Sequence, residues 1–169
     1  AGCEVPFIRP KELGSDDATG VDTLIHAVKA IEEPYDLLVL LQPTSPFRSA
    51  ADIDGAIEKC IRGGANSCVS VSESVKHPAW MYTLGESGLI EPFVEQEKVA
   101  ARRQDLEPVF ALNGAVYVVV NKALVESEKL LFPGSTLGYS MPSIRSLDID
   151  TEFDFSLCVL LAQSGLLDR

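Results

Sequence analysis

Two acids near the end of the chain, Asp148 and Asp150, have the chemistry and the spacing of a metal site. On an extended backbone, residues two apart point to the same side, so both carboxylates would lie together and Ile149 would face the core. Such a pair suits a hard divalent cation such as Mg²⁺, which takes its remaining ligands from phosphate and water. Alternatively, both are solvated acids before a helix N-terminus, where negative charge is favourable.

A polar, proline-stiffened turn follows the most apolar stretch of the sequence. The five aliphatic residues 37–41 predict a strand buried on both faces, and Gln42, Thr44, Ser45 and Arg48 come directly after it. In open α/β sheets, ligands bind outside the carboxyl ends of the strands. The turn is therefore a candidate pocket wall. The alternative for Thr44 and Ser45 is that their hydroxyls only cap the next helix.

A small basic cluster lies in an otherwise irregular region, where Arg102 and Arg103 precede Gln104. Guanidinium groups bind carboxylates through two parallel hydrogen bonds, so an acidic ligand would explain them. Ion pairs with neighbouring acids of the same solvated loop explain them equally well.

Helical and strand patterns alternate along the chain, which predicts an α/β fold with a parallel sheet. Ser49 with Asp52 and Thr151 with Asp154 have the spacing of helix-capping pairs. Residues 73–112 mix aromatic and charged residues with weak periodicity and are interpreted as an arm or β-ribbon outside the sheet. We expect one domain over 1–169, with helices starting at 21, 49, 122 and 151, strands at 37–41, 67–72 and 115–120, and a loop over 137–145.

Composition narrows the possible partners. The chain has 169 residues, of which 46% are hydrophobic and 23% are charged, and no apolar run has the length of a membrane span. Its formal net charge of −11 disfavours nucleic acid, because binding to a phosphate backbone needs clustered Lys and Arg. We therefore expect a cytoplasmic protein with no nucleic-acid or membrane partner.

Several motifs resemble those of the acylneuraminate cytidylyltransferases, which activate acidic nine-carbon sugars with CTP. The stretch Leu-Gln-Pro-Thr-Ser-Pro-Phe-Arg at 41–48, followed by Asp-Ile-Asp at 52–54, resembles the central motif of that family. Asn-Gly-Ala-Val-Tyr at 113–117 is similar to the start of one of its strands, and Gly114 would let the backbone approach a ligand closely. Arg9 with Pro10, Leu13 and Asp16 resembles a stretch near the nucleotide, and the acids at 148–154 resemble its Asp-x-Asp metal motif.

The resemblance implies a three-layer α/β fold with a mainly parallel sheet, of the nucleotide-diphospho-sugar transferase type. It implies that the anomeric hydroxyl of an acidic sugar attacks the α-phosphorus of CTP and releases pyrophosphate, with Mg²⁺ held by Asp148 and Asp150. The implied partners are CTP, an acidic sugar and a second subunit of a homodimer, toward which the arm would reach. The implied substrate-binding residues are Gln42, Thr44, Arg103, Gln104, Asn113 and Tyr117, and the implied nucleotide-binding residues are Arg9, Asp16, Thr19 and Thr23.

One family feature has no counterpart in this sequence. Members of the family begin with a strand and a loop rich in Gly, Lys and Arg that cradles the triphosphate, whereas Gly14 and Ser15 lie among acids here. We therefore expect the chain to correspond to the C-terminal part of the family domain, N-terminally truncated, with an exposed sheet edge that favours dimerisation. Two alternatives stay open: a non-catalytic binding or dimerisation module of the same fold, and a glycosyltransferase of related fold that uses its Asp-x-Asp to hold a nucleotide-sugar donor.

Overall fold

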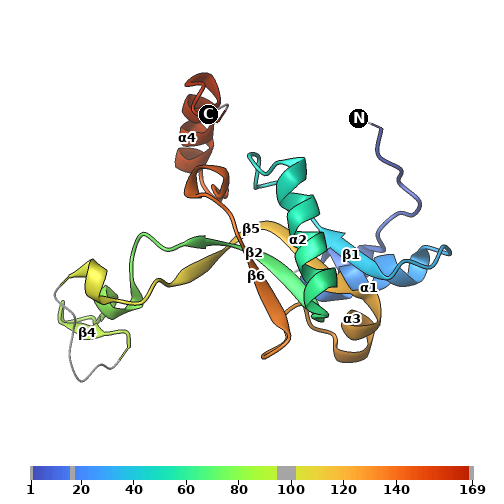
Figure 1. Cartoon of the computed structure of the whole chain (residues 1–169), viewed down its shortest axis with the longest axis horizontal. Helices are drawn as coiled ribbons and strands as arrows, with labels where there is room; N and C mark the ends of the chain where they lie inside the picture. Colours follow the sequence, from blue (N-terminus) through green and yellow to red (C-terminus); the bar gives the residue numbers. More distant parts are fainter. Residues whose placement is uncertain (1, 16–17, 95–101, 168–169) are drawn as a thin grey trace.

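The fold is organised around one four-stranded sheet in the order β1-β5-β2-β6. The structure is a computed structural model that describes residues 2–15, 18–94 and 102–167 (Figure 1). The strands are β1 (Leu37–Leu40), β2 (Ser67–Glu73), β5 (Phe110–Val120) and β6 (Thr136–Ser140).

The sheet is mixed. β5 pairs antiparallel with both β1 and β2, and β2 pairs parallel with β6. Three of the four strands therefore share one direction, as expected of a mainly parallel sheet, but only one of these pairings is itself parallel. β5 runs against the other strands because the chain leaves the sheet at the end of β2 and re-enters it directly beside β2, in the opposite direction.

The prediction of a loop over 137–145 was wrong for its first part, which forms β6. Its sequence, Thr-Leu-Gly-Tyr-Ser, alternates, and Leu137 and Tyr139 both pack against the core, but the strand is short and its central glycine weakens the strand signal. β6 is an edge strand that forms because β2 offers it a parallel partner, with Cys68 opposite Leu137 and Ser70 opposite Tyr139.

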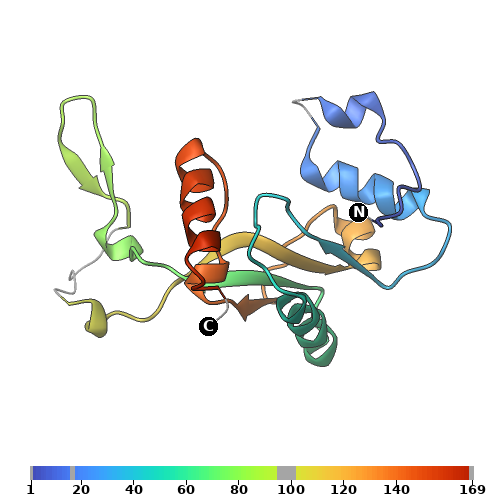
Figure 2. The same ribbon diagram turned by 90° about the horizontal axis from the view of Figure 1, so that it is seen from above.

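Helices cover both faces of the sheet and give the predicted three layers (Figure 2). The helices are α1 (Gly20–Ala30), α2 (Ala50–Gly63) and α3 (Asn121–Ser127). Neighbouring side chains of β5 point to opposite faces, so Val118 packs with the α2 residues Ala56 and Cys60 while Val119 packs with α1 and α3. A strand buried on both sides explains the run of valines in β5.

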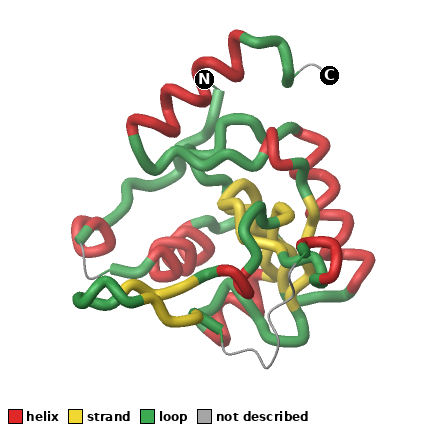
Figure 3. Tube along the Cα trace, turned by 90° about the vertical axis from the view of Figure 1, so that its left-hand side faces the viewer, coloured by secondary structure: helices red, strands yellow, loops and turns green. Residues whose placement is uncertain are grey.

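The capping signals in the sequence are confirmed. Ser49 and Asp52 form a capping box at the start of α2, and Thr151 and Asp154 form another at the start of α4 (Glu152–Gln163). α4 stands apart from the sheet in Figures 1 and 3. Of its described side chains, Cys158 is buried, whereas Phe153 is 75% exposed.

Residues 74–94 and 102–109 lie outside the sheet between β2 and β5, and we call this segment the arm. The predicted bounds of 73–112 were too wide, because Glu73 ends β2 and Phe110 begins β5. It contains two short 3-10 helices, Pro78–Trp80 and Arg103–Asp105, and the antiparallel hairpin of β3 (Tyr82–Leu84) and β4 (Ile90–Pro92). All residues of β3 and β4 are exposed. The arm extends well away from the sheet (Figure 1).

β1 lies at an edge of the sheet, although its sequence is that of a central strand. A cavity of about 260 Å³ lies beside it on the α1 side, lined by Val28, Ile31 and Leu38 among others. Another of about 450 Å³ lies beside it on the α2 side, lined by residues that include Ile61 and Ala65. Within the described residues no strand pairs with the outer edge of β1.

Candidate active site

The turn after β1 and the segment with the two acids are joined through their backbones. The Ile149 N–H donates to the carbonyl oxygen of Thr44 at 2.9 Å. Residues far apart in sequence are thereby placed side by side, and Asp148 lies next to the turn that starts at Gln42. The candidate site therefore lies beyond the carboxyl end of β1, where the sequence predicted a pocket wall.

Gly114 lies between the two segments in a conformation that favours glycine. Its φ is +71°, and a Cβ atom built on it would lie 2.5 Å from Gln42 Oε1 and 3.0 Å from Asp148 Oδ2. Neither distance is compatible with a side chain at this position without displacement of its neighbours. The missing side chain of Gly114 therefore allows Gln42 and Asp148 to converge on the same backbone.

A bulge in β5 creates this convergence. Val69 of β2 pairs with Tyr117, whereas Val71 pairs with Leu112. Residues 113–116 of β5 therefore lie opposite the single residue Ser70 of β2. The Ser70 hydroxyl fills the gap in the ladder: it accepts the Val116 N–H at 2.8 Å and lies 3.1 Å from the Val116 carbonyl oxygen.

Asn113, at the start of the bulge, is buried and hydrogen-bonded within the protein. Its Oδ1 accepts from the Ser70 hydroxyl and from the Ala115 N–H, and its Nδ2 donates to Ser146 Oγ at 2.9 Å and contacts Met141 Sδ at 3.5 Å. The amide has little hydrogen-bonding capacity left for a ligand. This arrangement supports a role in positioning the 146–150 segment against β5.

Asp148 is half-buried, and its environment fits a cation. Its Oδ1 is shielded from solvent and has no hydrogen-bond partner among the described residues. A buried carboxylate oxygen without a partner is costly, and a bound cation or a ligand donor would satisfy it. Burial raises the pKa of the neighbouring Tyr117 phenol, and the negative charge of Asp148 raises it further.

Asp150 lies in a different environment, at the start of α4. It is exposed, and its N–H donates to Asp154 Oδ2 at 3.3 Å. In the described part of the chain, no three His, Cys, Asp or Glu side chains gather as a ready metal site. A cation here would thus rest on Asp148 and Asp150 together with substrate phosphate and water, the usual mode of Mg²⁺.

Arg48 holds the turn in place rather than lining it with a free charge. Its Nη1 donates to the carbonyl oxygens of Gln42, Ser45 and Ala115. Burial lowers the pKa of this guanidinium. One cation thus ties the turn after β1 to the bulge in β5. The sequence shows the arginine but not its contact with Ala115, because that residue comes much later in the chain, on β5.

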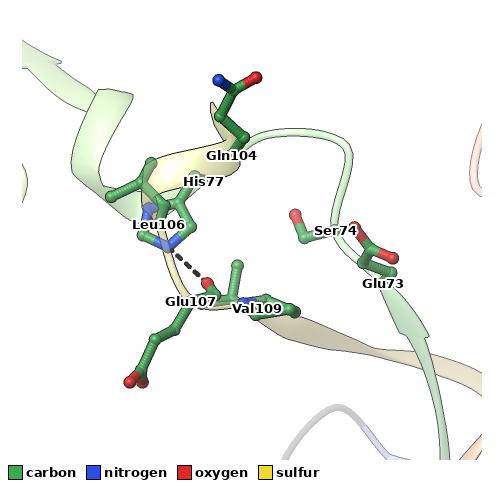
Figure 4. A pocket seen from close by; sticks show the side chains of 8 residues that line it. Glu73, Ser74, His77, Gln104, Leu106, Glu107 and Val109 are labelled. Carbon is green, nitrogen blue, oxygen red and sulfur yellow. Dashed lines mark hydrogen bonds between the residues drawn. The ribbon is translucent and has the colours of Figure 1, made fainter. Parts of the chain in front are cut away.

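The predicted sugar-binding pair in the arm lies at a second location. Gln104 lines an open cavity of about 580 Å³ at the base of the arm, together with His77 and Glu107 (Figure 4). His77 Nε2 lies 3.2 Å from the Glu107 carbonyl oxygen, and the Gln104 side chain points away from that contact. Arg103 begins a 3-10 helix, but its side chain lies outside the described residues.

Of the predicted nucleotide-binding residues, Thr19 and Thr23 lie at the start of α1 and Arg9 lies in the segment before it. Arg9 is exposed, with its guanidinium beside Gly14. Thr19 caps α1: its hydroxyl accepts from the Asp22 N–H and donates to Asp22 Oδ2 at 2.7 Å. Thr23 is half-buried in the same helix, and Asp16 lies outside the described residues.

Comparison with a solved structure first defines the fold. The crystal structure of 4-diphosphocytidyl-2C-methyl-D-erythritol synthase from Anaerococcus prevotii superposes with a TM-score of 0.56 over 87% of this chain and 65% of that one, at 11% identity. At this identity the likeness shows the fold alone, which is that of the nucleotide-diphospho-sugar transferases, as predicted. No protein-family model matches the chain.

Sequence relatives then define the family. The CMP-N,N'-diacetyllegionaminic acid synthase of Legionella pneumophila is 31% identical over 92% of this chain and 68% of its own length. The pseudaminic acid cytidylyltransferase of Campylobacter jejuni is 25% identical over 95% of this chain and 69% of its own length. The chain belongs to the acylneuraminate cytidylyltransferase family, as its motifs predicted.

The match is partial for the larger relatives. The N-acylneuraminate cytidylyltransferase of Streptococcus agalactiae is 38% identical over 148 residues, which are 88% of this chain and 35% of that protein. The chain thus spans about a third of the length of this relative. Among the described residues, no helix has the length and apolar character needed to cross a membrane.

Proposed function

We propose that the chain carries the residues that bind the acidic sugar and the metal ion in a cytidylyltransferase site. Such a site activates a nonulosonic acid with CTP and releases pyrophosphate. The observation that carries the proposal is the half-buried Asp148, whose Oδ1 has no partner within the described residues and which converges with Gln42 on Gly114. Membership of the family supports the same chemistry.

In the proposed reaction, the anomeric hydroxyl oxygen of the sugar forms a bond to the α-phosphorus as the bond to the pyrophosphate oxygen breaks, and the hydroxyl proton leaves to solvent. Most of the catalysis is positioning and charge stabilisation. Asp148 and Asp150 would hold Mg²⁺, which supplies neutralisation of the phosphates and a lower pKa of the attacking hydroxyl.

The remaining residues bind and orient. Gln42 has its amide beside Asp148 and would bind a sugar hydroxyl close to the reacting centre, and Thr44 would contact the same ligand from the turn. Tyr117 would donate from its phenol, which burial keeps neutral. Arg103 and Gln104 would bind the sugar carboxylate, and Arg9, Asp16, Thr19 and Thr23 the nucleotide.

We further propose a homodimer formed through the arm and a cytoplasmic location. In the arm, Leu84 of β3 is 74% exposed and Ile90 of β4, its partner across the hairpin, is 60% exposed. Apolar pairs this exposed are typical of a surface that another chain covers. The family resemblance points to the neighbouring subunit as that chain.

A second candidate is a binding module of the same fold without catalysis. It is favoured by one observation: among the described residues, no three His, Cys, Asp or Glu side chains gather as a ready metal site. The test is pyrophosphate release by the chain with CTP, Mg²⁺ and a panel of sialic, legionaminic, pseudaminic and ketodeoxyoctonic acids.

Release with at least one acid, and none when that acid is omitted, is the expected result. It would exclude the glycosyltransferase alternative, which consumes a nucleotide-sugar donor instead of CTP. Sugar binding by calorimetry without pyrophosphate release would favour the binding module, and neither binding nor release by well-folded protein would overturn the proposal.

A further inference from the structure

A partly buried ion pair lies next to the candidate site but has no part in binding as described so far. Arg145 donates to Asp52 through both arms of its guanidinium, with Nε to Oδ2 at 3.0 Å and Nη2 to Oδ1 at 2.9 Å. The Asp52 side chain is 1% exposed and that of Arg145 is 35% exposed. A two-point pair of this kind fixes orientation as well as distance.

The Asp52 end of the pair is anchored in the core. Asp52 Oδ2 also accepts from the Ser49 N–H at 2.9 Å and from the Ser49 hydroxyl at 2.7 Å, which closes the capping box of α2. Ala56 and Cys60 of the same helix are buried against the sheet. The carboxylate therefore has little freedom to move. Burial alone would raise its pKa, but the hydrogen bonds from Arg145 and Ser49 outweigh burial, so the pKa is lowered.

The Arg145 end leads directly to the candidate metal ligand. Arg145 ends a 3-10 helix (Ser143–Arg145), after which Ser146 Oγ accepts from Asn113 and the Ile149 N–H donates to Thr44. Asp148 lies between these last two contacts. Three tethers thus hold the short segment that carries it: one to α2, one to the bulge of β5 and one to the turn after β1.

Of these three tethers, the Asp52–Arg145 pair alone carries charge on both partners and makes two hydrogen bonds. We propose that Asp52 and Arg145 are positioning residues that hold the Asp148 carboxylate beside Gln42 in the geometry that binds the divalent cation. The inference rests on the proposed function, because it assigns the pair a role in that same site.

The test separates positioning from simple stabilisation. Arg145→Met removes the charge and both hydrogen bonds, and Arg145→Lys keeps the charge without the fork. Arg62→Met is the matched control, because Arg62 pairs with Glu58 on the exposed face of α2. Two properties are measured by NMR on the labelled chain: hydrogen exchange of the Ile149 amide, and broadening of the amides around Asp148 by Mn²⁺ alone.

In Arg145→Met we expect Ile149 exchange to rise about tenfold or more, as for loss of a charged hydrogen-bonded contact. We expect the Mn²⁺ concentration for half-maximal broadening to rise about tenfold or more, the size of effect seen when a group that orients a metal ligand is removed. Arg145→Lys should fall between Met and wild type, and Arg62→Met should match wild type.

A different pattern would overturn the inference. If Arg145→Met lowers the unfolding free energy but leaves both Ile149 exchange and the Mn²⁺ midpoint unchanged, the pair only stabilises the fold. If the wild type shows no Mn²⁺ broadening near Asp148, the proposed metal site fails. In that case Ile149 exchange still decides whether the pair orders the segment.

Discussion

The N–H of Ile149 donates a 2.9 Å hydrogen bond to the carbonyl oxygen of Thr44. This contact brings together two segments that lie far apart in the sequence, the polar turn after β1 and the acids before α4. Its consequence is a site in which Asp148 lies beside Gln42, with room left by Gly114.

Replacement of Gly114 by alanine should damage both the fold and the site. The positive φ alone costs about 1 kcal/mol for a residue with a Cβ, and here the Cβ would also meet Gln42 Oε1 at 2.5 Å. We expect urea unfolding to show a larger loss of stability than for Gly134→Ala. Gly134 has φ +77° and nothing within 4 Å of its Cβ position, so equal losses would mean that the Gln42 side chain moves aside without measurable cost.

Removal of the Ser70 hydroxyl should open the β5 bulge. Ser70→Ala leaves the buried Val116 N–H and Asn113 Oδ1 short of a partner, a loss of about 1–3 kcal/mol in unfolding free energy. The exposed Ser127, whose hydroxyl donates to the Ala123 carbonyl within α3, is the matched control. Chemical denaturation of Ser70→Ala and Ser127→Ala measures the difference, and similar values for both would contradict the role given to Ser70.

Tyr117 reports the charge of Asp148. Burial, the larger cause, and the Asp148 charge both raise its pKa, so the neutral phenol is favoured in the folded state. Its contribution to stability is therefore fully present below the unfolded pKa of about 10, and is lost as pH rises through the higher folded value.

Asp148→Asn should lower the pKa of Tyr117 without returning it to the ordinary range, because the burial remains. Titration of the tyrosine ring by NMR measures it, with the exposed Glu126→Gln as control. No change in the Asp148 variant would mean that the two side chains do not interact.

Asp52 should make the fold sensitive to acid. Although burial opposes its charge, hydrogen bonds from Arg145 and Ser49 lower its pKa. The stability that it contributes is present above the unfolded pKa of about 3.9, and is lost as pH falls through the lower folded value. Asp52→Asn should flatten the acid limb of a curve of unfolding free energy against pH, and an unchanged limb would refute the assignment.

The exposed apolar pair of the arm should control self-association. Leu84→Ser with Ile90→Ser removes exposed apolar surface that contributes little to the core, so we expect light scattering to show a lower molar mass at unchanged thermal stability. Ile61→Ser on α2, at a side chain 62% exposed outside the arm, is the control. A molar mass that falls in the control but not in the arm variant would move the interface away from the arm.

Local features of this fold could be predicted from the sequence, whereas contacts across it could not. The capping boxes at Ser49 and Thr151 depend on residues three apart, so the pattern predicts them directly. The direction of β5 depends on where the arm returns, so it has no local signal. The local signal of β6 is weak, because only Leu137 and Tyr139 alternate around a glycine, and the strand depends on its partner β2.

The same distinction applies to the candidate site. The spacing of the acids and the polar turn pointed to Asp148 and Gln42. Gly114 was expected to let the backbone approach a ligand, and the structure shows the side chains of Gln42 and Asp148 beside it. The sequence could not show that the amide of Asn113 is already hydrogen-bonded within the protein, or that Asp52 pairs with Arg145, since their partners come from other elements.

The most direct test of the central claim is the rate of CTP-dependent pyrophosphate release by Asp148→Asn, compared with the wild type at saturating Mg²⁺ and acidic sugar. We predict a fall of about a hundredfold or more, as for loss of a group that stabilises transition-state charge. The Glu126→Gln control should be unchanged. A rate for Asp148→Asn that stays within about twofold of the wild type would contradict the assignment of Asp148 to the reacting centre.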